Sequence, residues 1–210
     1  ENKPVSIVEY YGECSSNQMS GNTGSSNYAN LIFSDGASGT ITGAVNVSET
    51  TTIANGTGKA LTLSGANTFT GLVTIGQASP AVTGGTLVIN AASDLTIAAG
   101  ALCDSLAASV TSGDSGKTIT LEGSLTSTGT VTLTGRNVNT AGGTSGSPAV
   151  LTVPGNLTIN ANYQNNGYIQ NNAETQVNGS ITNNGEYKAN SNTSFTANFT
   201  DSGTWQSSNQ

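Results

Sequence analysis

Apolar residues recur every eighteen positions in the last third of the chain, between Gly155 and Gln210. Glycine opens successive blocks at positions 167, 185 and 203, and 185 − 167 = 18 and 203 − 185 = 18. Three apolar columns follow the same spacing: Leu151, Ile169, Tyr187 and Trp205; Ile159, Val177 and Phe195; and Tyr163, Ile181 and Phe199. Apolar residues in register at a fixed period are typical of a solenoid, in which each coil stacks on the next.

The local pattern within each block predicts strands rather than helices. Short alternating segments, rich in Thr and aromatic residues, are broken by Asn-Gly. Eighteen residues at about 3.3 Å each give a coil of roughly 60 Å, enough for three faces. Asn165–Gly167 and Asn183–Gly185 are predicted corners, because Asn and Gly tolerate the left-handed conformation of a tight bend. The alternative, a disordered polar tail, is disfavoured by the aligned aromatic columns.

The rest of the chain carries strand signals without a strict period. Segments such as Thr118–Leu121 and Thr130–Leu133 alternate with Ile, Leu or Val inward. The fold class is therefore all-β, a parallel β-solenoid over residues 31–210, with roughly 18-residue coils in the C-terminal third and coils of varying length before it. Residues 136–148 are poor in apolar side chains and are predicted to form a loop insertion.

Residues 1–30 are predicted to be an N-terminal arm or cap. The arm contains a short apolar strand, and this strand either covers its own first coil or pairs with another subunit by strand addition. The residues expected to make this contact are Val5, Ile7, Val8, Tyr10 and Tyr11.

One block resembles a known repeat. The segment Leu61–Gly71 reads LTLSGANTFTG, and it is followed by VTI at 73–75 and GTLVIN at 85–90. This stretch of about 30 residues, Leu61–Asn90, resembles the passenger-associated repeat of bacterial autotransporters, whose pattern is close to LTLSGANTYTGGTTI…GGTLxIN. The resemblance implies a right-handed parallel β-helix on a bacterial cell surface.

The composition of the chain excludes several classes of structure and partner. Charged residues make up 8% of the chain and hydrophobic residues 34%, with a net charge of −7. Disordered chains combine low hydrophobicity with high net charge. This chain has few charged residues, so it does not have the composition of an ordinary disordered chain. The five basic residues are scattered, so nucleic acid is not an expected partner: Lys3, Lys59, Lys117, Arg136 and Lys188. No apolar run approaches the 18 residues of a membrane span.

The first residue is Glu and not Met, which suggests a secreted chain from which a signal peptide has been removed. A chain boundary placed there for any other reason would give the same first residue. In a secreted protein, Cys14 and Cys103 favour one intrachain disulfide; two free buried thiols or a bond between subunits are the alternatives. Six Asn-x-Ser/Thr sequons would carry glycans if the source glycosylates: Asn46, Asn55, Asn156, Asn178, Asn192 and Asn198.

No catalytic, metal or cofactor site is predicted. The chain has no histidine, which removes Ser-His and Cys-His catalysis and most zinc sites. A glycosidase needs two facing carboxylates, yet one period either side of Glu186 lies Tyr168 or Thr204. Calcium-binding nonapeptides are absent. An ice-binding surface would need Thr-x-Thr pairs at a regular spacing, and the pairs in this chain do not recur at a fixed offset. The preference of Thr for exposed strand positions explains them better.

We therefore expect a non-enzymatic, extracellular cell-surface protein. The favoured function is a self-assembling subunit of a filament, sheath or coat, and the alternative is an adhesin that binds glycans or a host surface. Trp205 continues the column of Ile169 and Tyr187, and only five polar residues follow it. The last coil is thus predicted to be open and to pair with the N-terminal strand of the next subunit, which gives a filament.

Overall fold

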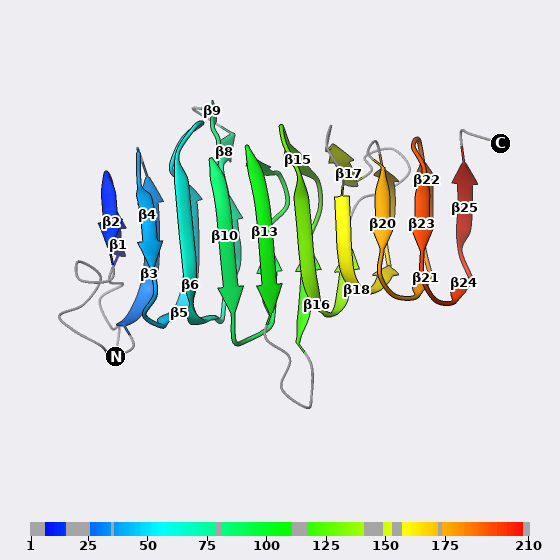
Figure 1. Cartoon of the computed structure of the whole chain (residues 1–210), viewed down its shortest axis with the longest axis horizontal. Helices are drawn as coiled ribbons and strands as arrows, with labels where there is room; N and C mark the ends of the chain where they lie inside the picture. The colour runs from blue at the N-terminus through cyan, green and yellow to red at the C-terminus, as the bar shows by residue number, and fades with distance from the viewer. Residues whose placement is uncertain are drawn as a thin grey trace.

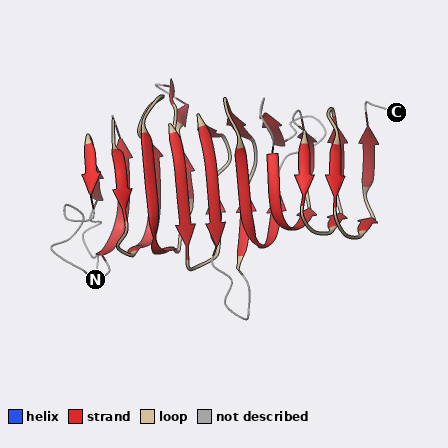
Figure 2. Cartoon of the chain, in the orientation of Figure 1, coloured by secondary structure: helices blue, strands red, loops and turns tan. Residues whose placement is uncertain are grey.

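The computed structural model describes residues 7–15, 26–34, 36–78, 81–110, 117–140, 149–152, 157–171 and 174–207. These residues wind into a parallel β-solenoid whose axis runs horizontally in Figure 1, from the first coil at the left to the last coil at the right. All regular structure in the described residues is strand (Figure 2). The predicted fold class is confirmed.

The strands stack on three faces, joined at corners. Face 1 contains β2 (Glu13–Ser15), β4 (Ser38–Ile41), β6 (Ala60–Phe69), β10 (Thr86–Ala91), β13 (Ser105–Val110), the first halves of β16 (Val131–Thr140) and β18 (Leu157–Asn165), β20 (Thr175–Val177) and β23 (Thr193–Phe195).

Face 2 follows face 1 along the chain. It contains β1 (Ile7–Tyr10), β3 (Ser26–Ser34), β5 (Val45–Ala54), β7 (Val73–Ile75), β11 (Leu95–Ile97), β14 (Thr118–Leu121), the second halves of β16 and β18, β21 (Ile181–Asn183) and β24 (Phe199–Asp201).

Face 3 closes the later coils. It contains β12 (Ala101–Cys103), β15 (Leu125–Ser127), β17 (Ala149–Thr152), β19 (Tyr168–Asn171), β22 (Glu186–Ala189) and β25 (Thr204–Ser207). A small antiparallel pair, β8 (Gln77–Ala78) and β9 (Ala81–Val82), follows β7.

The core is a set of buried columns that run along the axis. On face 1, Leu61, Leu87, Leu106, Val131 and Leu157 are successive partners, and all are buried. Their spacings are 87 − 61 = 26, 106 − 87 = 19, 131 − 106 = 25 and 157 − 131 = 26. Coil length varies because extra residues are accommodated at corners while the inward positions of the strands stay in register.

The eighteen-residue period holds from Leu157 onward. Its partner is Thr175, and the next partner is Thr193. The columns that end at Phe195 and Phe199 are confirmed, as is the alignment of Ile169, Tyr187 and Trp205.

The inclusion of Leu151 in the last column is wrong. Leu151 pairs with Asn171, and Ala149 pairs with Ile169, an offset of 169 − 149 = 20. The preceding coil is longer than eighteen residues, so the period does not extend back to it.

The Asn-Gly corners differ from the prediction. The glycines with positive φ lie elsewhere, at Gly36, Gly56 and Gly100 among others. Gly185 instead permits a close approach between coils, because a Cβ there would lie 2.1 Å from the carbonyl oxygen of Gly167. The left-handed interpretation is therefore wrong for Gly185, and the close approach of the stacked backbones explains why glycine occupies this position.

The predicted loop and the predicted N-terminal arm also have different boundaries in the structure. Asn137–Thr140 pairs with β14 and β18, and Val138 is buried, so the predicted loop at 136–148 is wrong over residues 136–140. Residues 141–148 lie outside the described residues. Within the predicted arm, β1 pairs with β3 and β2 pairs with β4, so the described residues 7–15 are strands of the first coil itself.

Candidate interaction surfaces

The C-terminal coil is the most open part of the core. Its strands β23, β24 and β25 each have a described partner on one side only: β20, β21 and β22. Phe195 is 42% exposed and Phe199 is 38% exposed, whereas Val177 and Ile181, one coil earlier in the same columns, are fully buried. Among the described residues, the large apolar side chains of this coil thus have no strand above them.

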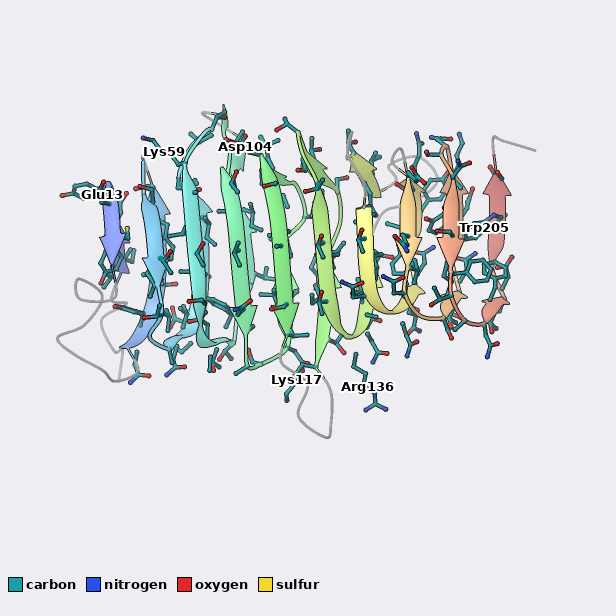
Figure 3. The ribbon with its side chains drawn as sticks, in the orientation of Figure 1. Glu13, Lys59, Asp104, Lys117, Arg136 and Trp205 are labelled. Atoms are coloured by element: carbon teal, nitrogen blue, oxygen red, sulfur yellow. The ribbon has the colours of Figure 1, made fainter. Side chains whose placement is uncertain are left out.

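These residues form an aromatic end cluster, which we define as Phe195, Phe199 and Trp205. Trp205 lies at the right-hand end of the molecule in Figure 3. Its ring stacks on Tyr187 at a centroid distance of 4.3 Å and contacts Phe199 edge-on at 5.0 Å. Phe195 stacks on Phe199 at 5.6 Å. Contacts of this kind hold aromatic rings in place, so the end of the core is a preformed apolar platform.

A buried polar stack runs beside the aromatic columns. Thr140 donates to Asn165 (3.0 Å), Asn165 donates to Asn183 (2.9 Å), and Asn183 donates to Asp201 (2.9 Å). Asn183 also donates to the carbonyl of Thr204, which fixes the turn between faces 2 and 3. The offsets 183 − 165 = 18 and 201 − 183 = 18 are visible in the sequence, but this stack was not predicted, because the asparagines were interpreted only as residues that tolerate a tight bend.

The N-terminal end is formed by β1. Ile7 is 62% exposed and Tyr11 is 74% exposed, whereas Val8 and Tyr10 pack partly against the core. The Tyr10 ring stacks on Phe33 at 6.0 Å, and desolvation raises the pKa of its hydroxyl. Val5 lies outside the described residues. The described strand therefore pairs in cis on one side and has no described partner on the other.

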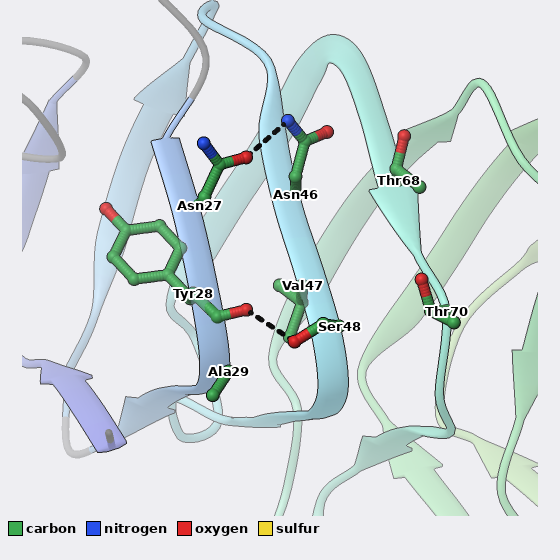
Figure 4. A pocket seen from close by; sticks show the side chains of 8 residues that line it. All are labelled: Asn27, Tyr28, Ala29, Asn46, Val47, Ser48, Thr68 and Thr70. Carbon is green, nitrogen blue, oxygen red and sulfur yellow. Dashed lines mark hydrogen bonds between the residues drawn. The ribbon is translucent and has the colours of Figure 1, made fainter. Parts of the chain in front are cut away.

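A shallow uncharged groove lies on the side of the N-terminal coils, where β3, β5 and β6 bend (Figure 4). Asn46 donates to the side-chain oxygen of Asn27 at 3.0 Å, and Ser48 donates to the carbonyl of Tyr28 at 3.3 Å. Thr68 pairs with Asn46 across the strands and continues this polar surface. The groove presents amides and hydroxyls but no carboxylate or ammonium group.

The predicted disulfide is wrong, because both cysteines are free and buried. Cys14 lies on face 1 and Cys103 on face 3, in the coil that begins with β10. From Cys14 the stack passes Gly39 and Leu61 before it reaches Leu87 in that coil. Three steps of about 4.8 Å place the two cysteines about 14 Å apart along the axis, whereas a disulfide needs Cα atoms within about 7 Å.

The environment of the two thiols also predicts low reactivity. Burial raises the pKa of Cys103 to about 11, and burial also raises the pKa of Cys14. Thiolate is the reactive form, so raised pKa values keep both side chains protonated near neutral pH.

Acidic side chains support corners rather than converge on one point. Asp94 accepts a hydrogen bond from the backbone N–H of Thr118 (2.9 Å), and Asp104 accepts one from Gly58 (2.7 Å). Glu49 accepts one from the Asn30 side chain at 2.9 Å. Among the residues that the structure describes, no group of three or more His, Cys, Asp or Glu side chains is placed to hold a metal ion.

The six sequons occupy different environments. Asn55 is fully buried and donates to the carbonyl of Ala37 at 2.9 Å, so the folded chain has no room for a glycan there. Asn178, Asn192 and Asn198 are exposed, and Asn46 is half-buried in the groove. Asn156 lies outside the described residues.

The block that resembles the autotransporter repeat has clear structural roles. Asn67 is fully buried; it donates to the carbonyls of Leu63 and Asn90 and accepts from the backbone N–H of Val45. A Cβ on Gly65 would lie 2.2 Å from the carbonyl oxygen of Gly43. These residues join three adjacent coils, which explains Gly65 and Asn67 at these positions of the chain.

Comparison with known proteins gives no assignment: no family model, no curated protein and no solved structure matches the chain. Within the described residues there is no helix long and apolar enough to cross a membrane. The architecture is a β-solenoid.

Proposed function

We propose that this chain is a non-enzymatic structural protein of an extracellular surface, where it assembles end to end into a filament, sheath or coat. The observation that carries the proposal is the aromatic end cluster. The strands β23, β24 and β25 have a free edge among the described residues, and such edges are templates for pairing with another chain. Here that edge also presents exposed Phe195 and Phe199.

The occupant is a second copy of the chain, added through β1. Both ends of the solenoid carry strands of the same parallel stack, so the N-terminal strand of one copy can continue the sheet of another in the same direction. Exposed Ile7 supplies apolar surface at the joining end. Such a contact uses different surfaces on the two partners and does not close, so it produces an open filament.

Charge affects this assembly in a predictable way. The chain carries a net charge of −7, Glu9 lies in β1, and Asp201 lies in β24. Like charges at the two joining ends oppose contact, and salt screens exposed charges. Assembly is therefore expected to increase from low to physiological ionic strength. The resemblance of Leu61–Asn90 to autotransporter repeats supports a bacterial cell surface as the location.

The test compares Phe199→Asp with Thr182→Asp by sedimentation velocity over a range of concentrations. Phe199→Asp places a charge in the end cluster, whereas Thr182→Asp makes the same charge change on an outward position one coil earlier. We expect the unmodified chain and Thr182→Asp to form concentration-dependent oligomers, and Phe199→Asp to remain monomeric with an unchanged circular dichroism spectrum. A monomeric unmodified chain at high concentration, or normal assembly of Phe199→Asp, contradicts the proposal.

A second candidate is an adhesin for neutral glycans, and the groove of Figure 4 favours it. Amides and hydroxyls without charge suit uncharged sugar hydroxyls, and Asn27, Asn46 and Thr68 present them side by side. Binding of the monomer to a neutral glycan array, lost on Thr68→Lys and retained on Thr120→Lys, supports this function. Equal glycan binding by both variants removes the groove as the site.

A further inference from the structure

From β4 to β23, the described outward positions of face 1 form a long surface without charge. In the five strands from β6 to β18, one outward column consists of Thr62, Val88, Ala107, Thr132 and Thr158. Charged residues lie beside this surface and not on it. In Figure 3, Lys59 and Asp104 mark one long edge of the front strands, and Lys117 and Arg136 mark the other.

The polar groups of the neighbouring column already have partners along the stack. Ser109 donates to Asn90 at 2.6 Å, Asn160 donates to Thr134 at 3.2 Å, and Asn178 donates to Asn160 at 2.7 Å. A buried polar group is costly when it loses its hydrogen bonds to water without replacement. These side chains retain hydrogen bonds within their own stack, so covering them with another surface costs little.

The side chains are also short and restricted. Thr and Val are branched at Cβ and have few χ1 rotamers, and Ala has none to lose. Covering this column therefore loses much less side-chain entropy than covering Lys, Glu or Gln. Depletion of charge in the middle and charge at the rim is also the pattern of protein interfaces.

We infer that face 1 is a lateral docking surface for a second copy of this chain, packed face to face about a two-fold axis. A chain with a net charge of −7 repels its copies, and an uncharged face is where two of them can approach. A two-fold contact places the same surface on both partners, so like charges would oppose each other across it; this column has none. Small uncharged side chains on flat strands also pack in dry sheet-to-sheet interfaces.

The size of the face fits a weak contact that gains strength by repetition. Eight strands from β4 to β23, about 4.8 Å apart and four residues wide, give roughly 450 Å² on each copy. The total of about 900 Å² is at the low end for a specific interface. This inference rests on the proposed end-to-end assembly in one respect: each filament repeats the face at every subunit, and linked contacts gain avidity. Filaments are therefore expected to run in pairs.

The test uses Thr132→Lys on face 1, with Thr158→Lys as a second variant and Thr120→Lys on face 2 as the matched control. Thr132 and Thr120 are both half-buried and outward. Negative-stain microscopy measures whether filaments are paired, and circular dichroism checks the fold. We expect paired filaments for the unmodified chain and for Thr120→Lys, and single filaments for both face 1 variants. Single filaments of the unmodified chain, or pairing that survives both face 1 substitutions, overturn the inference and leave end-to-end assembly intact.

If no filament forms, end-to-end assembly fails and the lateral contact is judged separately. Sedimentation equilibrium at millimolar concentration then compares the same variants. A dimer of the unmodified chain that Thr132→Lys abolishes, and Thr120→Lys preserves, supports the face 1 contact. A monomer, or a dimer insensitive to Thr132→Lys, overturns it.

Discussion

Replacing Ile181 with Asp tests the register on which the whole description depends. Ile181 is fully buried in β21, between Tyr163 on the preceding coil and Phe199 on the following coil. Removing the buried aliphatic side chain costs about 2–5 kcal/mol. A buried Asp must also be neutralised, and raising its pKa from about 3.9 to above 7 adds about 4 kcal/mol at neutral pH.

The combined cost of about 6–9 kcal/mol approaches the whole stability of a typical domain, about 5–15 kcal/mol. In a solenoid each coil depends mainly on its nearest neighbours, so the damage is expected to be local. The coils after β18 should unravel while the earlier coils stay folded. The matched control is Thr182→Asp, the next residue on the same strand, which is outward; a surface change of this kind costs less than about 0.5 kcal/mol.

Hydrogen exchange followed by mass spectrometry separates these outcomes along the chain. We expect Ile181→Asp to lose amide protection from about residue 175 onward and to keep it before residue 150, with a smaller circular dichroism signal. Thr182→Asp should match the unmodified chain throughout. Equal protection in the two variants means that position 181 faces solvent, and the assigned register is then refuted.

Four further predictions concern buried polar groups. Mass spectrometry of the unreduced chain should show two free thiols, and an aromatic disulfide reagent should label Cys103 only after denaturation; a Cys14–Cys103 cross-link contradicts this. Because burial raises the folded-state pKa of Cys103 from 9 to about 11, folding disfavours the thiolate, so the contribution of this thiol to stability is constant below pH 9 and falls as the pH rises through 11. Between pH 8 and pH 10 the loss from Cys103 is about 1 kcal/mol, so urea unfolding should show a loss of stability larger by this amount in the unmodified chain than in Cys103→Ala, and equal losses contradict it. Asn183→Ala leaves the amide of Asn165 and the carboxylate of Asp201 without their shared partner and should cost about 1–3 kcal/mol, whereas the exposed Asn184→Ala should cost much less; equal thermal melts contradict the buried stack. Expression in a glycosylating host should leave Asn55 unmodified in folded protein, and a glycan found there by peptide mapping contradicts its burial.

The sequence is informative where the period is strict. Tyr163, Ile181 and Phe199 repeat at eighteen residues, and the structure stacks them as predicted. Inward residues of successive coils touch directly, so their apolar character appears in the sequence. The fold class follows from these columns together with the alternation of strands.

The sequence is less informative where coils differ in length. The number of residues between Cys14 and Cys103 does not show how many coils separate them, so the disulfide prediction had no geometric basis. The same variation misplaced Leu151 by two residues. Asn165 was predicted only as a corner residue, because asparagine tolerates a tight bend, and its buried amide, which donates to Asn183 of the next coil, was not predicted. A residue's role at a corner depends on what stacks above it, which a single coil does not reveal.

The candidate surfaces were predicted only in part. The column that ends at Trp205 pointed to the C-terminal end, and there the structure places Phe199 beside Trp205 and Phe195 beside Phe199. The uncharged column of face 1 was not predicted, because Thr62, Val88 and Thr132 come together only through pairings between coils of unequal length.

The central claim, end-to-end assembly, is tested most directly by electron microscopy of the purified chain at high concentration and physiological salt. Ten strands stack on face 2 in the described residues: β1, β3, β5, β7, β11, β14, β16, β18, β21 and β24. At about 4.8 Å each, they set a subunit length of about 48 Å. The account predicts filaments with an axial repeat of about 48 Å and a continuous 4.8 Å spacing along the axis. Isolated particles of one subunit, or closed dimers without an axial repeat, contradict it.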